Sequence, residues 1–495
     1  MGQDQTSAHS TAKPARTIPA SLLIATLAFW LGGAQLLLWR FLDVLPPVAY
    51  VAGLTLLAAL CIPLARLRLP GIPPATLLLC FLVALALMIL GGEGRFLYAN
   101  IDWQVRFAVL RDLTASPWPF VYTDRGTPDL LRAPIAMFLI PALAGKAGGP
   151  AVADMAMLLQ NSALLALILA LGSLLFETRR TRLTALAVVI MFSGLDALGR
   201  LLFRGGLSDH IENWAFLQFS SYINLAFWVP NHALSGWIGA LFTLLWRRNL
   251  IPLGSFLALL PLTALWSPLG LIGAMPFAAL AAARALAARQ IRWPDIALPA
   301  AATLLSLPGL LYLAAAPDAV GTRITAQVPF QWAMFELLEV LVYAIPLALA
   351  WRSNRFGVDT LALLTLCLLA LPFVQIGWST DLMMRGSIAA LAILAVMTAD
   401  AVARPGRVRW WLVAMLLIGS ITGLTEIRRA FAWPPAPQVQ CSFPQAWDQS
   451  FSDFPKGSWL APLSQVPAVI RPENPAPVSP GATPCWQGHW HSPDD

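Results

Sequence analysis

The sequence contains a succession of apolar runs that are too long for the core of a soluble domain. The first three cover residues 18–41, 47–64 and 72–91, and a helix that crosses a bilayer needs roughly 20 mostly apolar residues. Only 12% of the residues are charged and 58% are hydrophobic, whereas a soluble domain is about 25% charged. The chain is therefore predicted to be an all-α polytopic membrane protein.

Further apolar runs raise the predicted number of transmembrane helices to about 13. They cover residues 151–176, 183–203, 232–246, 251–267, 269–287, 296–316, 332–351, 358–376, 385–402 and 410–425. The transmembrane helical domain is accordingly predicted to extend over residues 18–425.

The distribution of charge predicts which side of the membrane each loop faces. More than half of the 32 Lys and Arg residues, but few of the 25 acidic residues, fall in alternate turns, and cytoplasmic loops carry an excess of basic residues. The tail of residues 1–17 is then cytoplasmic, and the C-terminus is periplasmic or extracytoplasmic. We expect a multi-pass protein of the inner (plasma) membrane. Its net charge of +7 reflects this orientation and membrane-lipid contact, so nucleic acid is not expected as a partner.

Two segments outside the membrane stand apart from the spans. Residues 92–150 form a large outer loop, in which "RAPIAMFLIPALAGKAGG" (132–149) is apolar for only about a dozen residues, so it is predicted to be interfacial or re-entrant rather than spanning. Residues 426–495 should form a small extracytoplasmic tail. Cys441 and Cys485 in this tail share an oxidising compartment and can form a disulfide.

The polar stretch "YANIDWQVRFAVLRDL" in the outer loop holds the first candidate catalytic residue. It is predicted to be an amphipathic helix lying along the membrane surface, with Trp103 and Phe107 on one face. Asp102 at the mouth of a helical bundle can act as a general base. The alternative is an ordinary ion pair with Arg106, four residues further on. Asp112, next to Arg111, is a weaker candidate.

A second candidate pair lies in "STDLMMRGS", at the outer end of a predicted span. Asp381 and Arg385 are separated by four residues. The planar fork of arginine fits phosphate oxygens, so Arg385 is a candidate phosphate ligand. The alternative is an arginine that extends its charge to the membrane surface.

A third candidate set lies in "RGGLSDHIENW" and "FWVPNHALSGW", both near the outer interface. A hydrogen-bonded structural role is the alternative for each histidine, and the tryptophans fit an aromatic belt. No Cys or His spacing resembles a metal site, so neither a metal nor another cofactor is expected. The candidate substrate-binding residues here are Arg204, His210, Glu212 and His232, with Asp209 beside them.

The order of these segments resembles the first outer loop of the GT-C glycosyltransferases. A helix ends outside, an acid follows on a surface helix, a short apolar helix with "AP" at its start comes next, and the chain re-enters the membrane. The resemblance implies polyprenyl-phosphate-linked sugars as donors, a glycan, lipid or protein as acceptor, and Asp102 as catalytic base. Two features depart from that class: two extra helices precede the loop, and no second acid adjoins Asp102.

The hypothesis is an inverting transfer of sugar at the outer face of the membrane. Asp102 takes a proton from an acceptor hydroxyl, and Arg385, with Arg106 or Arg204, holds the departing phosphate. A transporter or flippase of lipid-linked saccharides is one alternative, which Glu336 and Glu339 within a span would favour. A polymerase or ligase of such saccharides and a non-enzymatic scaffold are others.

Overall fold

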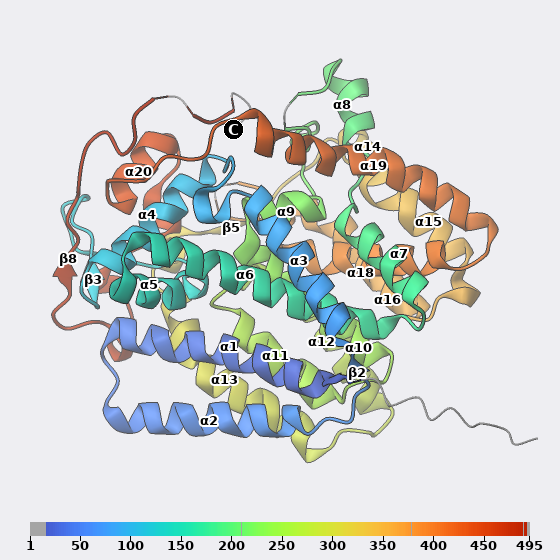
Figure 1. Cartoon of the computed structure of the whole chain (residues 1–495), viewed down its shortest axis with the longest axis horizontal. Helices are drawn as coiled ribbons and strands as arrows, with labels where there is room; N and C mark the ends of the chain where they lie inside the picture. Colours follow the sequence, from blue (N-terminus) through green and yellow to red (C-terminus); the bar gives the residue numbers. More distant parts are fainter. Residues whose placement is uncertain (1–15, 209, 378, 489, 493–495) are drawn as a thin grey trace, which may run out of the picture.

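The computed structural model describes residues 16–208, 210–377, 379–488 and 490–492. The fold is mostly helical, and eight helices of the described residues are long and apolar enough to cross a membrane (Figure 1). This fits the predicted all-α membrane protein, but the count of about 13 spans is not confirmed. The eight are α1 (Ala20–Leu42), α2 (Pro47–Ala65), α6 (Pro150–Gly172) with its 3₁₀ extension to Leu175, α12 (Pro268–Ala287), α13 (Trp293–Leu313), the α14–α15 unit (Pro329–Leu349), α17–α18 (Asp381–Ala403) and α19 (Arg407–Ala432).

Other predicted spans form shorter or different helices. The α14–α15 unit consists of α14 (Pro329–Glu336), a π-helix (Leu337–Leu341) and α15 (Val342–Leu349), and α17 (Asp381–Gly386) leads into α18 (Ile388–Ala403). The remaining helices are α3 (Pro74–Leu90), α4 (Asp102–Ala115), α5 (Ala136–Gly148), α7 (Arg179–Ile190), α8 (Asp196–Arg204), α9 (Tyr222–Trp228), α10 (Pro230–Arg247), α11 (Leu253–Thr263), α16 (Val358–Ala370) and α20 (Phe443–Ser450). Short 3₁₀ turns occupy Glu93–Arg95, Pro317–Ala319, Trp351–Ser353, Leu371–Phe373, Lys456–Ser458, Leu463–Gln465 and Ala468–Ile470.

The single span predicted for residues 183–203 is wrong, because the helix ends at Ile190 and α8 begins at Asp196. In the break, the Ser193 hydroxyl donates to Asp196 Oδ2 at 2.8 Å. A Cβ atom at Gly194 would overlap the Glu339 carboxylate. The chain thus leaves the helix where glycine allows a buried carboxylate from another helix to approach the backbone.

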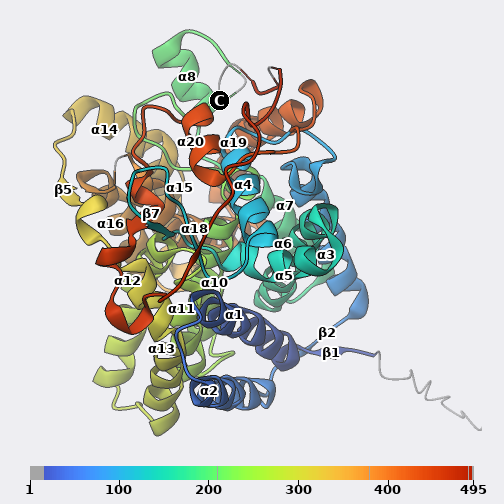
Figure 2. The ribbon, with the colours of Figure 1, turned by 90° about the vertical axis from the view of Figure 1, so that its left-hand side faces the viewer.

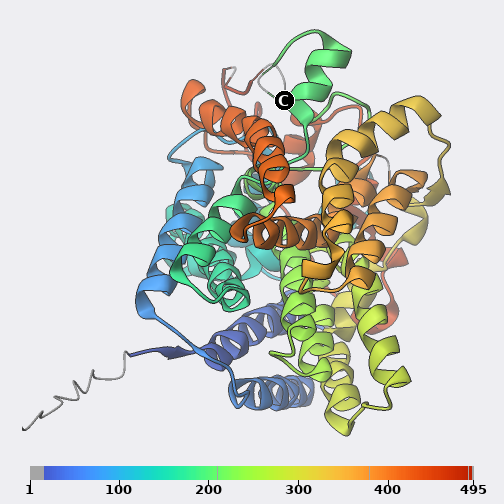
Figure 3. The same cartoon turned by 90° about the vertical axis from the view of Figure 1, so that its right-hand side faces the viewer.

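The helices pack in groups that Figures 1 and 3 show from two sides. α1 packs on α2 and α13, and α13 also packs on α11, at the bottom of both views. α3 and α5 pack against α6, while α10 contacts α6, α12 and α18. α15 and α19 pack beside α18. α10 therefore joins the group of helices around α6 to the group around α18.

The C-terminal segment does not begin where the sequence predicted. α19 continues through Glu426 and Arg429 to Ala432, because both charges are buried and bonded to each other at 3.0 Å. The predicted boundary at residue 425 therefore lies inside a helix.

The rest of this segment folds back over the outer loop (Figure 2). β4 (Asp129–Leu131) pairs antiparallel with β7 (Leu460–Pro462), and β3 (Phe120–Val121) pairs parallel with β8 (Ala476–Pro477). α20 packs on α4, and Cys441 and Cys485 form the expected disulfide. The outer loop and the tail therefore form one covering layer.

Two other short antiparallel pairs join β1 (Ile18–Pro19) to β2 (Gly71–Ile72) and β5 (Thr322–Ile324) to β6 (Val374–Ile376).

α5 is the helix of the segment at 132–149. It has 13 residues, fewer than the roughly 20 needed to span, and it packs against α6, α4 and α1. Its interfacial or re-entrant position in the outer loop stays a prediction.

Candidate functional site

α4 carries the first candidate residues and is fixed to the bundle at its N-terminal end. The Trp103 indole N–H and the Asn100 amide both donate to the backbone carbonyl of Phe227, at 2.7 and 3.1 Å. Trp103 and Phe107 are buried as expected, but Arg106 is buried as well. The prediction of an amphipathic helix is therefore wrong, because residues on all sides of α4 are buried and α5 and α20 pack against it.

Asp102 and Arg106 form the ion pair considered in the sequence, with Arg106 Nη2 3.0 Å from Asp102 Oδ2. The two side chains differ in exposure: 28% for Asp102 but only 5% for Arg106. Arg106 Nη1 is buried and has no hydrogen-bond partner among the described residues. A buried cationic donor without an acceptor is costly, so this nitrogen is available to an anion.

Arg385 lies within electrostatic range of Arg106. Burial and the positive charge of Arg385 lower the pKa of Arg106, whereas Asp102 and Glu93 raise it. Arg385 Nη1 pairs with Asp381 Oδ1 at 2.9 Å, and both side chains are about one quarter exposed, 24% and 23%. The guanidinium groups of α4 and α17, far apart in sequence, are thus within electrostatic range of each other, and each is paired with an aspartate of its own helix.

His232 and Glu93 complete this group, which we call the Arg106 cluster: Glu93, Asp102, Arg106, His232, Asp381 and Arg385. His232, at the start of α10, is in electrostatic range of both arginines. Its Nδ1 lies 2.7 Å from the Ser267 hydroxyl.

Glu93 was not predicted from the sequence. It is fully buried, its Oε1 accepts from Asn161 at 2.9 Å, and burial raises its pKa well above the ordinary range. It lies between Gly92 and Gly94, whose φ angles of +91° and +74° suit glycine. The signal in the sequence is the acid in "GGEGR", where a turn directs it inward.

Arg204 lies elsewhere. It is on the exposed face of α8, where its Nε donates to the Trp214 carbonyl at 3.2 Å and its guanidinium is 5.0 Å from the ring centre of Phe216. Neither of these contacts joins Arg204 to the Arg106 cluster.

His210 belongs to a second group, the Glu426 cluster: Tyr98, His210, Trp228, Glu426 and Arg429. His210 Nδ1 lies 2.9 Å from Glu426 Oε1, and the Trp228 indole donates to Oε2 at 3.2 Å. Burial lowers the pKa of His210, but the hydrogen bond to Glu426 and the negative charges of Glu426 and Glu212 together raise it more, so the net direction is upward. Asp209 lies outside the described residues. The sequence did not single out Tyr98, Glu426 or Arg429, because their pairing depends on segments far apart in the chain.

Glu212 follows in the same loop and is almost fully buried. It accepts from the Ser221 backbone N–H at 2.7 Å and from the Gln218 amide at 2.9 Å. Burial and the nearby Asp196 raise the pKa of Glu212 to about 7. Both Glu212 and His210 therefore hold the loop in place.

Asp112 has a structural role between the two parts of the covering layer. Its Oδ2 accepts from the Tyr122 hydroxyl at 2.9 Å and from the Phe443 backbone N–H at 2.7 Å. Arg111 pairs with Oδ1 at 2.6 Å. Burial raises the pKa of Asp112 to about 6 despite these bonds.

We expect ionisation of Asp112 to lower the free energy of unfolding as the pH rises. Folding raises the pKa of Asp112 from 3.8 to about 6, so the folded state binds the proton more tightly than the unfolded state. The free energy of unfolding therefore falls as the pH rises from about 4 to about 6. The free energy of unfolding should decrease by at most about 3 kcal/mol from pH 4 to pH 7. Thermal unfolding followed by tryptophan fluorescence at several pH values measures this. Asp112→Asn should remove that part of the pH dependence, whereas exposed Asp124→Asn should retain it; equal slopes for the two variants would contradict the assignment.

Comparison with known proteins adds no relative. No protein-family model matches the chain, and neither does any curated protein or solved structure. The Arg106 cluster must therefore be interpreted from its own chemistry: two arginines, each paired with a carboxylate that is about one quarter exposed, and one of them with a buried donor that has no partner among the described residues. Among the described residues, no group of His, Cys, Asp and Glu side chains has an arrangement that could hold a metal ion.

Proposed function

We propose that the chain transfers a sugar from a polyprenyl-phosphate donor to an acceptor hydroxyl, with Asp102 as general base. The observation that carries the proposal is the buried guanidinium of Arg106. One of its arms is bound to Asp102, the other has no partner among the described residues, and Arg385 lies close by. A phosphate between the two arginines would satisfy the free donor and screen their mutual repulsion.

The chemistry follows from what each side chain offers. Asp102 accepts the proton of an acceptor hydroxyl while the oxygen attacks the anomeric carbon. The bond from that carbon to the phosphate oxygen breaks, and the negative charge that grows on the phosphate is stabilised by Arg106 and Arg385. In-line attack inverts the configuration of the sugar carbon. The phosphate departs as an anion, so no general acid is required.

In the proposal this cluster lies on the outer face of the inner membrane. The excess of arginines in the loops at the opposite ends of the helices supports this orientation. A donor on a polyprenyl chain would reach the cluster laterally, from the lipid. The acceptor is then a glycan, a lipid or a protein of the cell envelope.

A transporter or flippase of lipid-linked saccharides is the second candidate, on a specific observation. Glu336 and Glu339 are buried within the α14–α15 unit, and neither oxygen of Glu336 has a hydrogen-bond partner among the described residues. Ionisable side chains within a span often mark a transport path, and π-helical turns such as Leu337–Leu341 are frequent at functional sites.

Turnover of a donor panel separates the two candidates. The purified protein is incubated with polyprenyl phosphates that carry different sugars, with and without an acceptor mixture, and release of polyprenyl phosphate is measured by mass spectrometry. Acceptor-dependent release is the expected result. Translocation of a lipid-linked saccharide across vesicles without any release would favour the transporter and overturn the transferase.

A further inference from the structure

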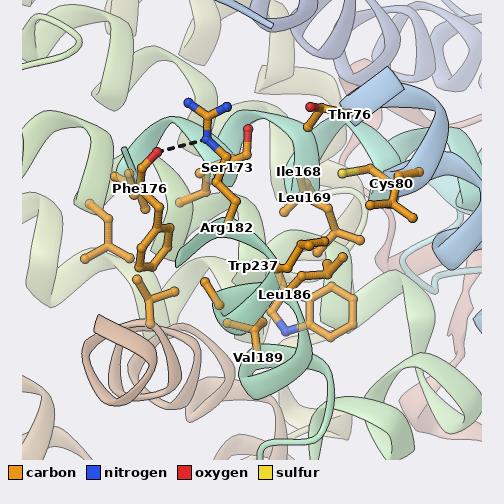
Figure 4. A pocket seen from close by; sticks show the side chains of 18 of the residues that line it. Thr76, Cys80, Ile168, Leu169, Ser173, Phe176, Arg182, Leu186, Val189 and Trp237 are labelled. Carbon is orange, nitrogen blue, oxygen red and sulfur yellow. Dashed lines mark hydrogen bonds between the residues drawn. The ribbon is translucent and has the colours of Figure 1, made fainter. Parts of the chain in front are cut away.

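A cavity of about 530 Å³ has its basic rim at the ends of α3 and α6 that lie away from Glu93 and Asp154. It is lined by the beginning of α3, the end of α6 and almost the whole of α7, by Tyr222 at the start of α9, and by parts of α10 and α18 (Figure 4). Glu93 follows the opposite end of α3, and Asp154 lies at the opposite end of α6. The volume is within the range of about 300–1,000 Å³ of small-molecule sites.

The walls of this cavity are apolar except at one rim. Thr76, Ser173, Arg179 and Arg182 are at the ends of their helices, where a bilayer meets water. Arg182 Nε donates to the Phe176 carbonyl at 3.0 Å, as Figure 4 shows. Among the described residues that line the cavity, the two arginines are the charged ones and no carboxylate faces them. The rim is therefore suited to an anion.

The other end of the cavity is closed by two stacked rings. Tyr222 and Trp237 have ring centres 3.8 Å apart and planes within 7°, and both line the cavity. From Arg179 to Val189, the lining of α7 extends about 15 Å. This is about half of the roughly 30 Å hydrocarbon core of a bilayer, so the cavity has the depth of one leaflet.

Two of the leucines that line the side walls are also exposed on the outside of the helix bundle. Leu79 and Leu183 line the cavity and are 38% and 44% exposed. Exposed leucines beside a cavity in a membrane-embedded bundle face lipid chains rather than water. A lipid chain can thus enter from the side while its headgroup stays at the basic rim.

We propose that this cavity binds one anionic phospholipid of the leaflet adjoining Arg179 and Arg182. Its phosphate contacts the two guanidinium groups, and one acyl chain lies between α3 and α7 and reaches toward Trp237. By the excess of basic residues in cytoplasmic loops, that leaflet is the cytoplasmic one. The site does not depend on the proposed transferase activity.

Native mass spectrometry of the purified chain tests the site by titration with phosphatidylglycerol and phosphatidylcholine that carry the same acyl chains. Wild type should retain one phosphatidylglycerol with a preference on the order of 20-fold over phosphatidylcholine, as two arginines at a membrane surface provide. The double variant Arg179→Gln/Arg182→Gln should lose this preference. Arg180→Gln/Arg289→Gln removes the same charge from exposed positions outside the cavity and should keep it.

A second variant tests the acyl-chain part without changing charge. A Cβ atom at Gly172 would meet only Leu241 Cδ1, at 3.9 Å, so Gly172→Phe has room to place its ring in the cavity. It should lower retention of the bound lipid at least about tenfold, whereas Gly172→Ala should not; thermal melting verifies that each variant is folded. Equal retention of the two lipids by wild type, identical losses in the two arginine pairs, or full retention in a folded Gly172→Phe would each overturn the proposal.

Discussion

Asp102→Asn is expected to lower kcat for sugar transfer by about 10²- to 10⁴-fold, the usual contribution of a general base. Asparagine keeps a side-chain oxygen that can accept from Arg106 Nη2, so the 3.0 Å contact can persist. It cannot take a proton from the acceptor hydroxyl. The loss should therefore appear in kcat, with little change in donor binding.

The exposure of Asp102 makes this the most direct test of its role. At 28% exposed, its side chain is more accessible than that of Arg106, so an acceptor can reach it. Release of polyprenyl phosphate is measured for the wild type, for Asp102→Asn and for Asp124→Asn, a matched change of an exposed acid in the same outer loop. Full activity of Asp102→Asn, with an unchanged melting temperature, would remove Asp102 as the base.

The sequence was sufficient for the class of fold because bilayer solvation imposes long apolar helices. It could not foresee the break between α7 and α8, which depends on the approach of Glu339 to Gly194. The sequence also predicted that the last span ends at residue 425, just before the charged Glu426. Glu426 and Arg429 neutralise each other and bond to Tyr98, Trp228 and His210, so the helix continues; such pairing is a tertiary property that no local pattern contains.

The candidate site was predicted in part. Asp102, Arg106, His232 and Arg385 were chosen as residue types near one side of the membrane. In the structure Asp102 pairs with Arg106, and His232 and Arg385 lie within electrostatic range of Arg106. Arg204, His210 and Glu212 were chosen on the same grounds and lie elsewhere, because position along the membrane normal does not determine position around the bundle. Glu93 was missed since an acid after a span is usually read as a solvated loop residue.

Arg106→Lys is expected to reduce kcat/KM for the lipid donor by about 10- to 150-fold. A lysine at this position keeps the positive charge and can still pair with Asp102. It has no second rigid arm to replace the buried Nη1, which is the donor without a partner in the described chain. A hydrogen bond to a charged group contributes about 1.5–3 kcal/mol, and this range gives the expected loss.

The division of the effect between kcat and KM identifies what Arg106 does. If its free arm stabilises charge that grows on the leaving phosphate, kcat should fall more than KM rises. Arg385→Lys should give a loss of the same kind, and the double variant should lose less than the sum in free energy because both arginines contact one phosphate. Arg204→Lys, on exposed α8, is the matched control and should retain wild-type rates. An Arg106→Lys protein within about threefold of wild type would reduce Arg106 to a structural partner of Asp102, since an ordinary exposed i,i+4 pair contributes only about 0.3–0.5 kcal/mol.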